Sequence, residues 1–186
     1  MKKYNAWLPL MLVVGFLGGV IEARADDREQ ILKRQIEINT ELLAKQPDDV
    51  HLHFSVGNDY YSLAKYLKER GSWFFQTNKK NSDSEEGDRL YLESIRHLKE
   101  AVRVQPRHGR AHFNLAVNYF IQEKKEAALY HMAKADQIFM MSGNTRGLEK
   151  SKKSLKEWYK KFDYHPGDFD VARNIQPRAP VAVMKK

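Results

Sequence analysis

The chain contains no cysteine among its 186 residues. It therefore cannot be held together by disulfides, bind a metal through thiolates or carry a lipid on an N-terminal cysteine. The sequence also lacks a nucleophile elbow, a phosphate-binding glycine loop, a metalloprotease helix and a haem attachment motif. Its carboxylates are scattered over the predicted helix surfaces, without an isolated pair on an apolar face. We therefore expect a protein that is not an enzyme and that holds no cofactor and no metal ion.

Long hydrophobic runs are scarce as well. The apolar run from Ala6 to Ile21 has 16 residues, with one proline and three glycines, which is short of the ~20 residues that span a bilayer. Two lysines precede it, and a small-x-small triplet ends at Ala25, so the pattern predicts a signal peptide, residues 1–25, cleaved after Ala25. The alternative is an uncleaved membrane anchor formed by residues 6–21. An exported chain without disulfides indicates the bacterial periplasm.

Two nine-residue stretches share one pattern. The first, HFSVGNDYY, occupies residues 53–61, and the second, HFNLAVNYF, occupies residues 112–120. A proline lies six residues before each stretch, at Pro47 and at Pro106. The apolar spacing is three to four residues throughout, which predicts helices and no strands. Further downstream, three positions repeat at an offset of 34 residues, with Ser94, Leu98 and Ala101 matching Ala128, Met132 and Ala135.

A period of 34 residues with these residue types is typical of tetratricopeptide repeats. Over residues 47–140 the chain resembles this family. The resemblance implies an all-α fold, a short α-solenoid of helical hairpins with flanking capping helices. In the first repeat the signature positions are His53, Val56, Gly57, Tyr60, Ser94, Leu98, Ala101 and Pro106. In the second they are His112, Leu115, Ala116, Tyr119, Ala128, Met132 and Ala135. The chain departs from the family where histidine replaces tryptophan twice, Ser94 replaces an alanine and Met140 replaces the closing proline.

The first repeat carries 25 additional residues between Tyr60 and Ser94. We interpret them as an elongation of the first hairpin, with both arms lengthened by two to four turns. The arms are predicted to meet at residues 78–81. Ser82 and Glu85 have the spacing of a capping box, which predicts the start of the second arm there.

A loop insertion over residues 69–88 is the alternative interpretation. Gly71 and Gly87 favour it, because each glycine costs about 1 kcal/mol inside a helix and either arm could break there. Three adjacent aromatics favour the helical interpretation, because a solvated loop rarely carries them. They also form a candidate second contact with a partner, and they are Trp73, Phe74 and Phe75.

Helices are also predicted on both sides of the repeats, so that the helical domain spans residues 26–162. Residues 28–46 form the first, with Asp26 or Asp27 as its cap. It carries two adjacent apolar stripes, Ile31, Ile38 and Leu42 in one and Leu32, Ile36 and Leu43 in the other. Residues 145–162 form a capping helix with an apolar face and a lysine-rich face. The tail, residues 163–186, has three prolines and no periodicity, so we expect it to be extended or disordered.

Seven histidines raise the question of a metal site. His108 and His112 are four residues apart, but His108 is predicted in the turn before the helix, and no acidic residue lies at ligand spacing. We therefore interpret His53 and His112 as packing residues in the place of the family's tryptophan. His97 is interpreted as an exposed helix residue.

In the tetratricopeptide family the first helix of each hairpin lines a concave groove. The resemblance therefore implies a partner-binding set of Phe54, Asn58, Tyr61, Arg110, Phe113, Asn114 and Phe120. Asn58 and Asn114 match asparagines of the family's carboxylate clamp, but Phe54 stands where the clamp has a lysine, so the clamp is incomplete. Aromatics with amides and an arginine suit an extended peptide or a partner helix. Packing between the helix layers is the alternative role for each of these aromatics.

We therefore expect a non-catalytic scaffold or adaptor of the bacterial cell envelope that binds another protein or a peptide. The formal net charge is +8, but nucleic acid is not an expected partner of an exported protein. The alternative is a membrane-surface or cell-wall accessory module. It would be anchored by residues 6–21 and would touch an anionic surface through the lysine-rich helix face. The sequence leaves the oligomeric state open.

Overall fold

The structure of the chain is a computed structural model. It describes the backbone of residues 8–73 and 78–164 and, within these, the side chains of residues 27–70 and 83–164. This part of the chain folds into six helices and no strands, which are α1 (Leu8–Lys45), α2 (Val50–Trp73), α3 (Asn78–Val104), α4 (Gly109–Ile121), α5 (Lys125–Met141) and α6 (Thr145–Phe162). The prediction of an all-α array of helical hairpins is confirmed.

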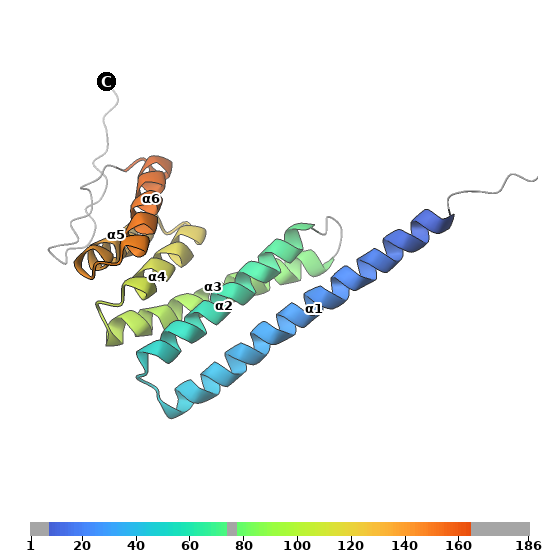
Figure 1. The fold of residues 1–186 in the computed structure, drawn as a ribbon, viewed down its shortest axis with the longest axis horizontal. Helices are drawn as coiled ribbons and strands as arrows, with labels where there is room; N and C mark the ends of the chain where they lie inside the picture. Colours follow the sequence, from blue (N-terminus) through green and yellow to red (C-terminus); the bar gives the residue numbers. More distant parts are fainter. Residues whose placement is uncertain (1–7, 74–77, 165–186) are drawn as a thin grey trace, which may run out of the picture.

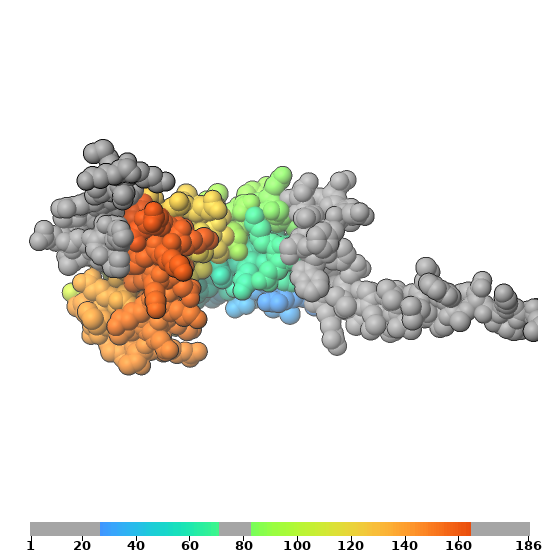
Figure 2. All heavy atoms as spheres, turned by 90° about the horizontal axis from the view of Figure 1, so that it is seen from above, coloured from blue at the N-terminus to red at the C-terminus, as the bar shows by residue number. Residues whose placement is uncertain are grey.

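Each helix packs on its neighbours in the chain. α1, α2 and α3 lie side by side as the long elements of the molecule, and α1 extends beyond the α2–α3 hairpin at its N-terminal end (Figure 1). The shorter helices α4, α5 and α6 follow at the opposite end. Seen from above, the described parts of α1, α2 and α3 share one stretch of the long axis, and α5 and α6 lie at its end (Figure 2). The first hairpin is therefore elongated, as predicted.

Small residues let the two arms of the first hairpin approach closely. Gly57 on α2 is buried, and a Cβ added there would lie 2.8 Å from Leu98 Cγ on α3. On the same turn Ser94 Oγ donates a 2.7 Å hydrogen bond to the Gly57 carbonyl oxygen. This bond explains how a serine fits at a fully buried position, because its hydroxyl is satisfied by the backbone of the facing helix.

The turn of this hairpin lies earlier than the sequence suggested. Residues 78–81 form the first turn of α3 and are not the connection between the arms. Ser82 is consequently inside a helix rather than at its N-cap. Neither arm breaks at its glycine, since α2 runs through Gly71 and α3 runs through Gly87. At Gly87 the arms touch, because an added Cβ would lie 2.9 Å from Lys68 Cγ.

Helix α1 also differs from the prediction. It begins at Leu8, not near residue 28, so Asp26 and Asp27 lie within the helix and do not cap it. The predicted cleavage position after Ala25 lies inside α1, and cleavage stays a prediction. None of the helices in the described residues is both long enough and apolar enough to cross a membrane.

The inner stripe of α1 packs on the hairpin. Leu32 and Ile36 pack against a cluster of buried residues on α2, and Leu43 is 8% exposed. An ionic cluster adds to this contact at the far end of the hairpin. Arg70 of α2 donates to Glu29 of α1 (2.5 Å) and to Asp83 of α3 (3.0 Å). Burial by itself raises the pKa of Glu29, but hydrogen bonds from Lys33 and Arg70 bring it below its usual range. These charges are mostly buried, so the cluster ties three helices together.

The C-terminal helix closes the array. Trp158 and Phe162 of α6 are buried against Ala116, Leu129 and Met132 of the second hairpin. The ordered structure continues past residue 163, where the tail was predicted to start. Tyr164 is 7% exposed, and its hydroxyl donates to the Glu126 carboxylate at 2.5 Å. The opposite face of α6 is exposed and basic, with Lys150, Lys152, Lys153, Lys156, Lys160 and Lys161.

Candidate functional site

The structure brings together two amides of the predicted groove. Asn58 lies on α2 and Asn114 on α4, and both side chains are half-buried. Asn114 Nδ2 donates a 2.5 Å hydrogen bond to Asn58 Oδ1. Behind this pair, the buried Asn118 Nδ2 donates to the Asn114 backbone oxygen at 2.9 Å. The amides thus bridge the first helices of the two hairpins, where the tetratricopeptide resemblance places a binding groove.

Each amide keeps one group for a further hydrogen bond. Among the described residues, no hydrogen bond uses the Asn58 amide nitrogen or the Asn114 side-chain oxygen. Exchanging the oxygen and nitrogen assignments of both amides gives the same result, one donor and one acceptor. A peptide group also has one donor and one acceptor, so the pair can bind an extended backbone through two bonds.

The aromatic side chains of the predicted set are held by their neighbours. Arg110 of α4 lies over the ring of Phe54, with its guanidinium carbon 5.0 Å from the ring centroid. Phe54 itself is only 9% exposed. Tyr61 packs against Tyr91 of α3, with ring centroids 5.8 Å apart. Phe54 is therefore mainly a packing residue, while Arg110 is exposed at the edge of the amide pair.

The second hairpin shows the same combination. Phe113 is half-buried beside Asn114, and its ring lies 6.4 Å from that of Phe139 on α5. Phe120 faces away from the amides and stacks on Trp158 of α6, with centroids 4.3 Å apart and planes 15° apart. Phe120 therefore holds α6 in place. The predicted set therefore divides into two packing residues, Phe54 and Phe120, and an amide strip between α2 and α4 that consists of Asn58, Tyr61, Arg110, Phe113 and Asn114.

The predicted second contact lies at the tip of the long hairpin. Trp73 is the last residue of α2. Phe74 and Phe75 lie outside the described residues, and contact through this tip stays a prediction.

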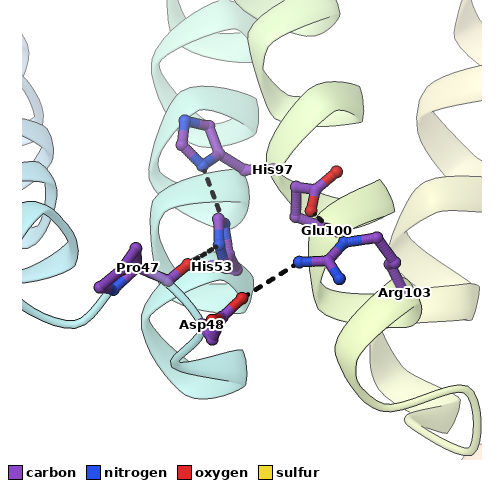
Figure 3. Close-up of polar contacts among 6 residues, drawn as sticks. All are labelled: Pro47, Asp48, His53, His97, Glu100 and Arg103. Carbon is purple, nitrogen blue, oxygen red and sulfur yellow. Dashed lines mark hydrogen bonds and ion pairs between the residues drawn. The ribbon is translucent and has the colours of Figure 1, made fainter.

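Two buried histidine pairs were not foreseen. His53 of α2 lies between the turn before that helix and His97 of α3 (Figure 3). Its Nε2 is 2.9 Å from the Pro47 carbonyl oxygen, and its Nδ1 is 3.3 Å from His97 Nδ1. The ring of His97 also stacks on Tyr60, with planes 16° apart. Arg103 makes a second link to the same turn through Asp48 (Figure 3).

The second repeat reproduces this pair. His112 Nε2 is 3.1 Å from the Pro106 carbonyl oxygen, and His112 Nδ1 is 2.9 Å from His131 Nδ1. His131 stacks on Tyr119, with planes 17° apart. His97 and His131 are 34 residues apart, the offset that relates the other repeated positions on these helices. Aligning the histidines at this offset would have revealed the pairing from the sequence.

Hydrogen-bonding rules fix the tautomers of the first pair. A carbonyl oxygen only accepts, so His53 Nε2 carries the proton that it donates to Pro47. In a neutral ring His53 Nδ1 is then an acceptor, and His97 Nδ1 is the donor. His97 Nε2 is left as an acceptor, and the Arg96 guanidinium lies 3.1 Å from it. When both rings are neutral, every hydrogen bond of the pair therefore has one donor and one acceptor.

Burial disfavours the charged form of His97, His112 and His131. It lowers the pKa of His97 to about 4, with further lowering by Arg96 and His53. Burial likewise lowers the pKa of His112 to about 4 and, with His112 as a second cause, that of His131 to about 3. The expectation that His97 is exposed was wrong, because it is 5% exposed. His53 and His112 are buried packing residues, and they also join each turn to its hairpin.

Metal chemistry has no evident site in the part of the chain that the structure describes. No group of three or more histidine, aspartate or glutamate side chains there could hold a metal ion. His108, the other histidine of the candidate zinc pair, caps α4 through an Nδ1 that accepts from the Ala111 backbone N–H at 3.0 Å. The amide strip between α2 and α4 is thus the candidate functional site. No protein-family model matches the chain, and no curated protein matches its sequence.

Proposed function

We propose that this protein is a non-catalytic, tetratricopeptide-like scaffold of the bacterial cell envelope that binds an extended segment of a partner protein between α2 and α4. The carrying observation is the Asn58–Asn114 pair, which joins the first helices of two hairpins and keeps one donor and one acceptor for a ligand. The cleavable signal that we expect at residues 1–25, which overlaps the start of α1, would deliver the domain to the periplasm.

The surroundings of the pair suit a peptide backbone with side chains. Tyr61 lies one turn after Asn58 on α2, Phe113 precedes Asn114 on α4, and both rings are half-buried, so they can cover apolar side chains of the ligand. Arg110 adds one exposed positive charge at the same edge. An extended peptide with an apolar residue and a nearby carboxylate matches this combination.

Site-specific photocrosslinking in cells tests the proposal. A photoreactive residue in place of Tyr61 or Phe113 should capture one partner protein, and the same residue in place of Leu92, which is 50% exposed on α3, should not. Asn58→Ala combined with Asn114→Ala should abolish capture. The matched control is Arg96→Ala, an exposed change on α3.

Either of two results would overturn the proposal. Capture at Leu92 equal to that at Tyr61 would show that the amide strip is not the binding surface. Capture that persists in the double asparagine variant would move the site to the long hairpin. Far-ultraviolet circular dichroism of the variants shows whether loss of capture reflects loss of fold.

The lysine face of α6 supports a second candidate function, a contact with an anionic membrane or wall polymer. Its six lysines are exposed on one helix, and Lys152, Lys153, Lys156 and Lys160 lie on the side away from the buried Trp158. Such a contact is electrostatic and is screened by salt. Fractionation of cells with and without high salt, on the native chain and on a variant with glutamine at these lysines, distinguishes it from the scaffold. Salt release that disappears in the variant supports the surface contact.

A further inference from the structure

The outer stripe of α1 is left uncovered by the rest of the described chain. Ile31 is 64% exposed, Ile38 46% and Leu42 39%, although the inner stripe of the same helix is packed on α2. With Gln35 between them, these positions follow one another at spacings of four, three and four residues. That spacing is the a/d seam of a two-helix coiled coil. One side of α1 therefore binds its own chain, and a second side is shaped to receive another helix.

The charges beside the stripe indicate which helix fits. Arg34 and Glu41 lie on the same edge of the stripe, seven residues apart, and both are exposed. In an antiparallel pair of identical helices, Ile31 packs against Leu42 of the second copy and Gln35 packs against Ile38 of the second copy. In that register Arg34 of each copy faces Glu41 of the other.

A parallel pairing does not use these charges. It would stack each stripe residue on its own equivalent and would place Arg34 opposite Asn39 of the second copy and Glu41 opposite Gln46 of the second copy. Only the antiparallel register makes two symmetric ion pairs, and opposite charges across a helix seam select the partner and its direction.

We propose that α1 is a dimerisation helix, which pairs antiparallel with α1 of a second copy of this chain about a two-fold axis, through Ile31, Gln35, Ile38 and Leu42. The two-fold symmetry follows because each copy offers the same surface to the other. The dimer leaves the amide strip between α2 and α4 untouched, so it does not depend on the proposed peptide binding.

The contacts seen in the single chain are compatible with this pairing. Arg34 is bonded to Glu37 at 2.7 Å, but these side chains are 70% and 55% exposed, so the bond can be exchanged at little cost. The paired segment ends where Arg28 would meet Lys45 of the second copy. Arg28 is turned aside there, with its guanidinium carbon 5.4 Å from the Tyr66 ring centroid.

The absence of cysteine makes the register directly testable. Full-length chains carrying Ile31→Cys, Leu42→Cys or both are expressed in cells and oxidised mildly. In one helix these positions are separated by about 16 Å, too far for a disulfide within the chain. The double variant should give a covalent dimer, and neither single variant should, because equal positions lie about 16 Å apart in the antiparallel register.

Other outcomes overturn the proposal. Dimers formed equally by each single variant would mean a parallel helix pair, and a disulfide to a different protein would mean a heterologous partner. No dimer in the double variant would mean that the stripe is not a self-association surface. Because these side chains are exposed in the single chain, the reduced cysteine variants should keep the native helix content, which circular dichroism measures alongside.

Charge exchange gives an independent test on cysteine-free protein. Arg34→Glu places two glutamates opposite each other at both ends of the seam and should weaken the dimer roughly tenfold, measured by sedimentation equilibrium. Adding Glu41→Arg restores opposite charges and should restore the dimer. Failure of the double variant to recover would contradict the register even if the single variant weakens association.

Discussion

The paired histidines make stability depend on pH in a direction that the structure fixes. Burial holds the pKa of His97 and of His112 at about 4 in the folded chain, against about 6.5 in an unfolded chain. As pH falls below about 6.5, the unfolded chain binds protons first, which favours unfolding. The stabilisation is therefore fully present above about pH 6.5 and is lost as the pH falls towards 4.

The magnitude follows from linkage. One histidine with these two pKa values loses about 2 kcal/mol of folding free energy between about pH 7.5 and pH 5. Once one ring of a pair is protonated, its charge opposes protonation of the other ring, so each pair is counted as one titrating histidine. The two pairs together therefore lose about 4 kcal/mol of folding free energy over this pH range. Carboxylates contribute little in this window, because their usual pKa values of about 4 lie below it.

Urea unfolding followed by circular dichroism at the two pH values measures this difference. Replacing one complete pair, with His112→Phe and His131→Leu, removes its protonatable groups and should reduce the difference to about 2 kcal/mol. Equal unfolding free energies at both pH values would refute the reasoning. So would a pH difference that is unchanged when the pair is removed, because the loss would then come from other groups.

Three further changes test the packing, each through the unfolding free energy at neutral pH. Arg70→Met leaves the mostly buried carboxylates of Glu29 and Asp83 without their cation and should cost about 3 kcal/mol. Replacing both carboxylates by amides as well should recover most of this loss. A loss below about 1 kcal/mol for Arg70→Met would mean that the cluster is solvated. Gly57→Ala should destabilise by about 1–3 kcal/mol through the clash with Leu98, whereas the same change in an unobstructed helix stabilises by about 1 kcal/mol, so a more stable variant would contradict the close approach. Trp158→Ala removes the ring stacked on Phe120 and should cost about 3–5 kcal/mol, with amide exchange accelerating first in α6; uniform acceleration would contradict a local role.

Helix existence was the easier part to predict from the sequence. The apolar period of three to four residues, with prolines before two of the helices, indicated every helix from α2 to α6. Helix ends were harder, because a local capping motif such as Ser82 with Glu85 competes with tertiary packing. Here α3 begins at Asn78, one turn before the predicted cap, so the capping motif did not mark the start of the helix.

The candidate site was partly predictable for a different reason. A repeat offset shows which positions are equivalent, so it indicated that Asn58 and Asn114 lie on corresponding helix faces. It does not show which neighbour covers a face. Phe120 was predicted to line the groove, but in the structure its ring stacks on Trp158 of α6. The periodicity of the sequence does not show how α6 lies relative to α4. His97 was misjudged similarly, since its burial comes from His53 and Tyr60 on the facing helix α2.

The pattern of contacts between neighbouring helices also affects how the chain folds. Apart from a small contact between α2 and α4, the substantial contacts within the described residues join helices that are consecutive in the chain. Such contacts close short loops and require little prior ordering, so folding should be fast and free of long-range searches. Each hairpin can form as soon as its second arm has been synthesised, and the next one adds to its open side. A chain that leaves the ribosome with its N-terminal end first can thus fold helix by helix, in the order in which the helices are synthesised.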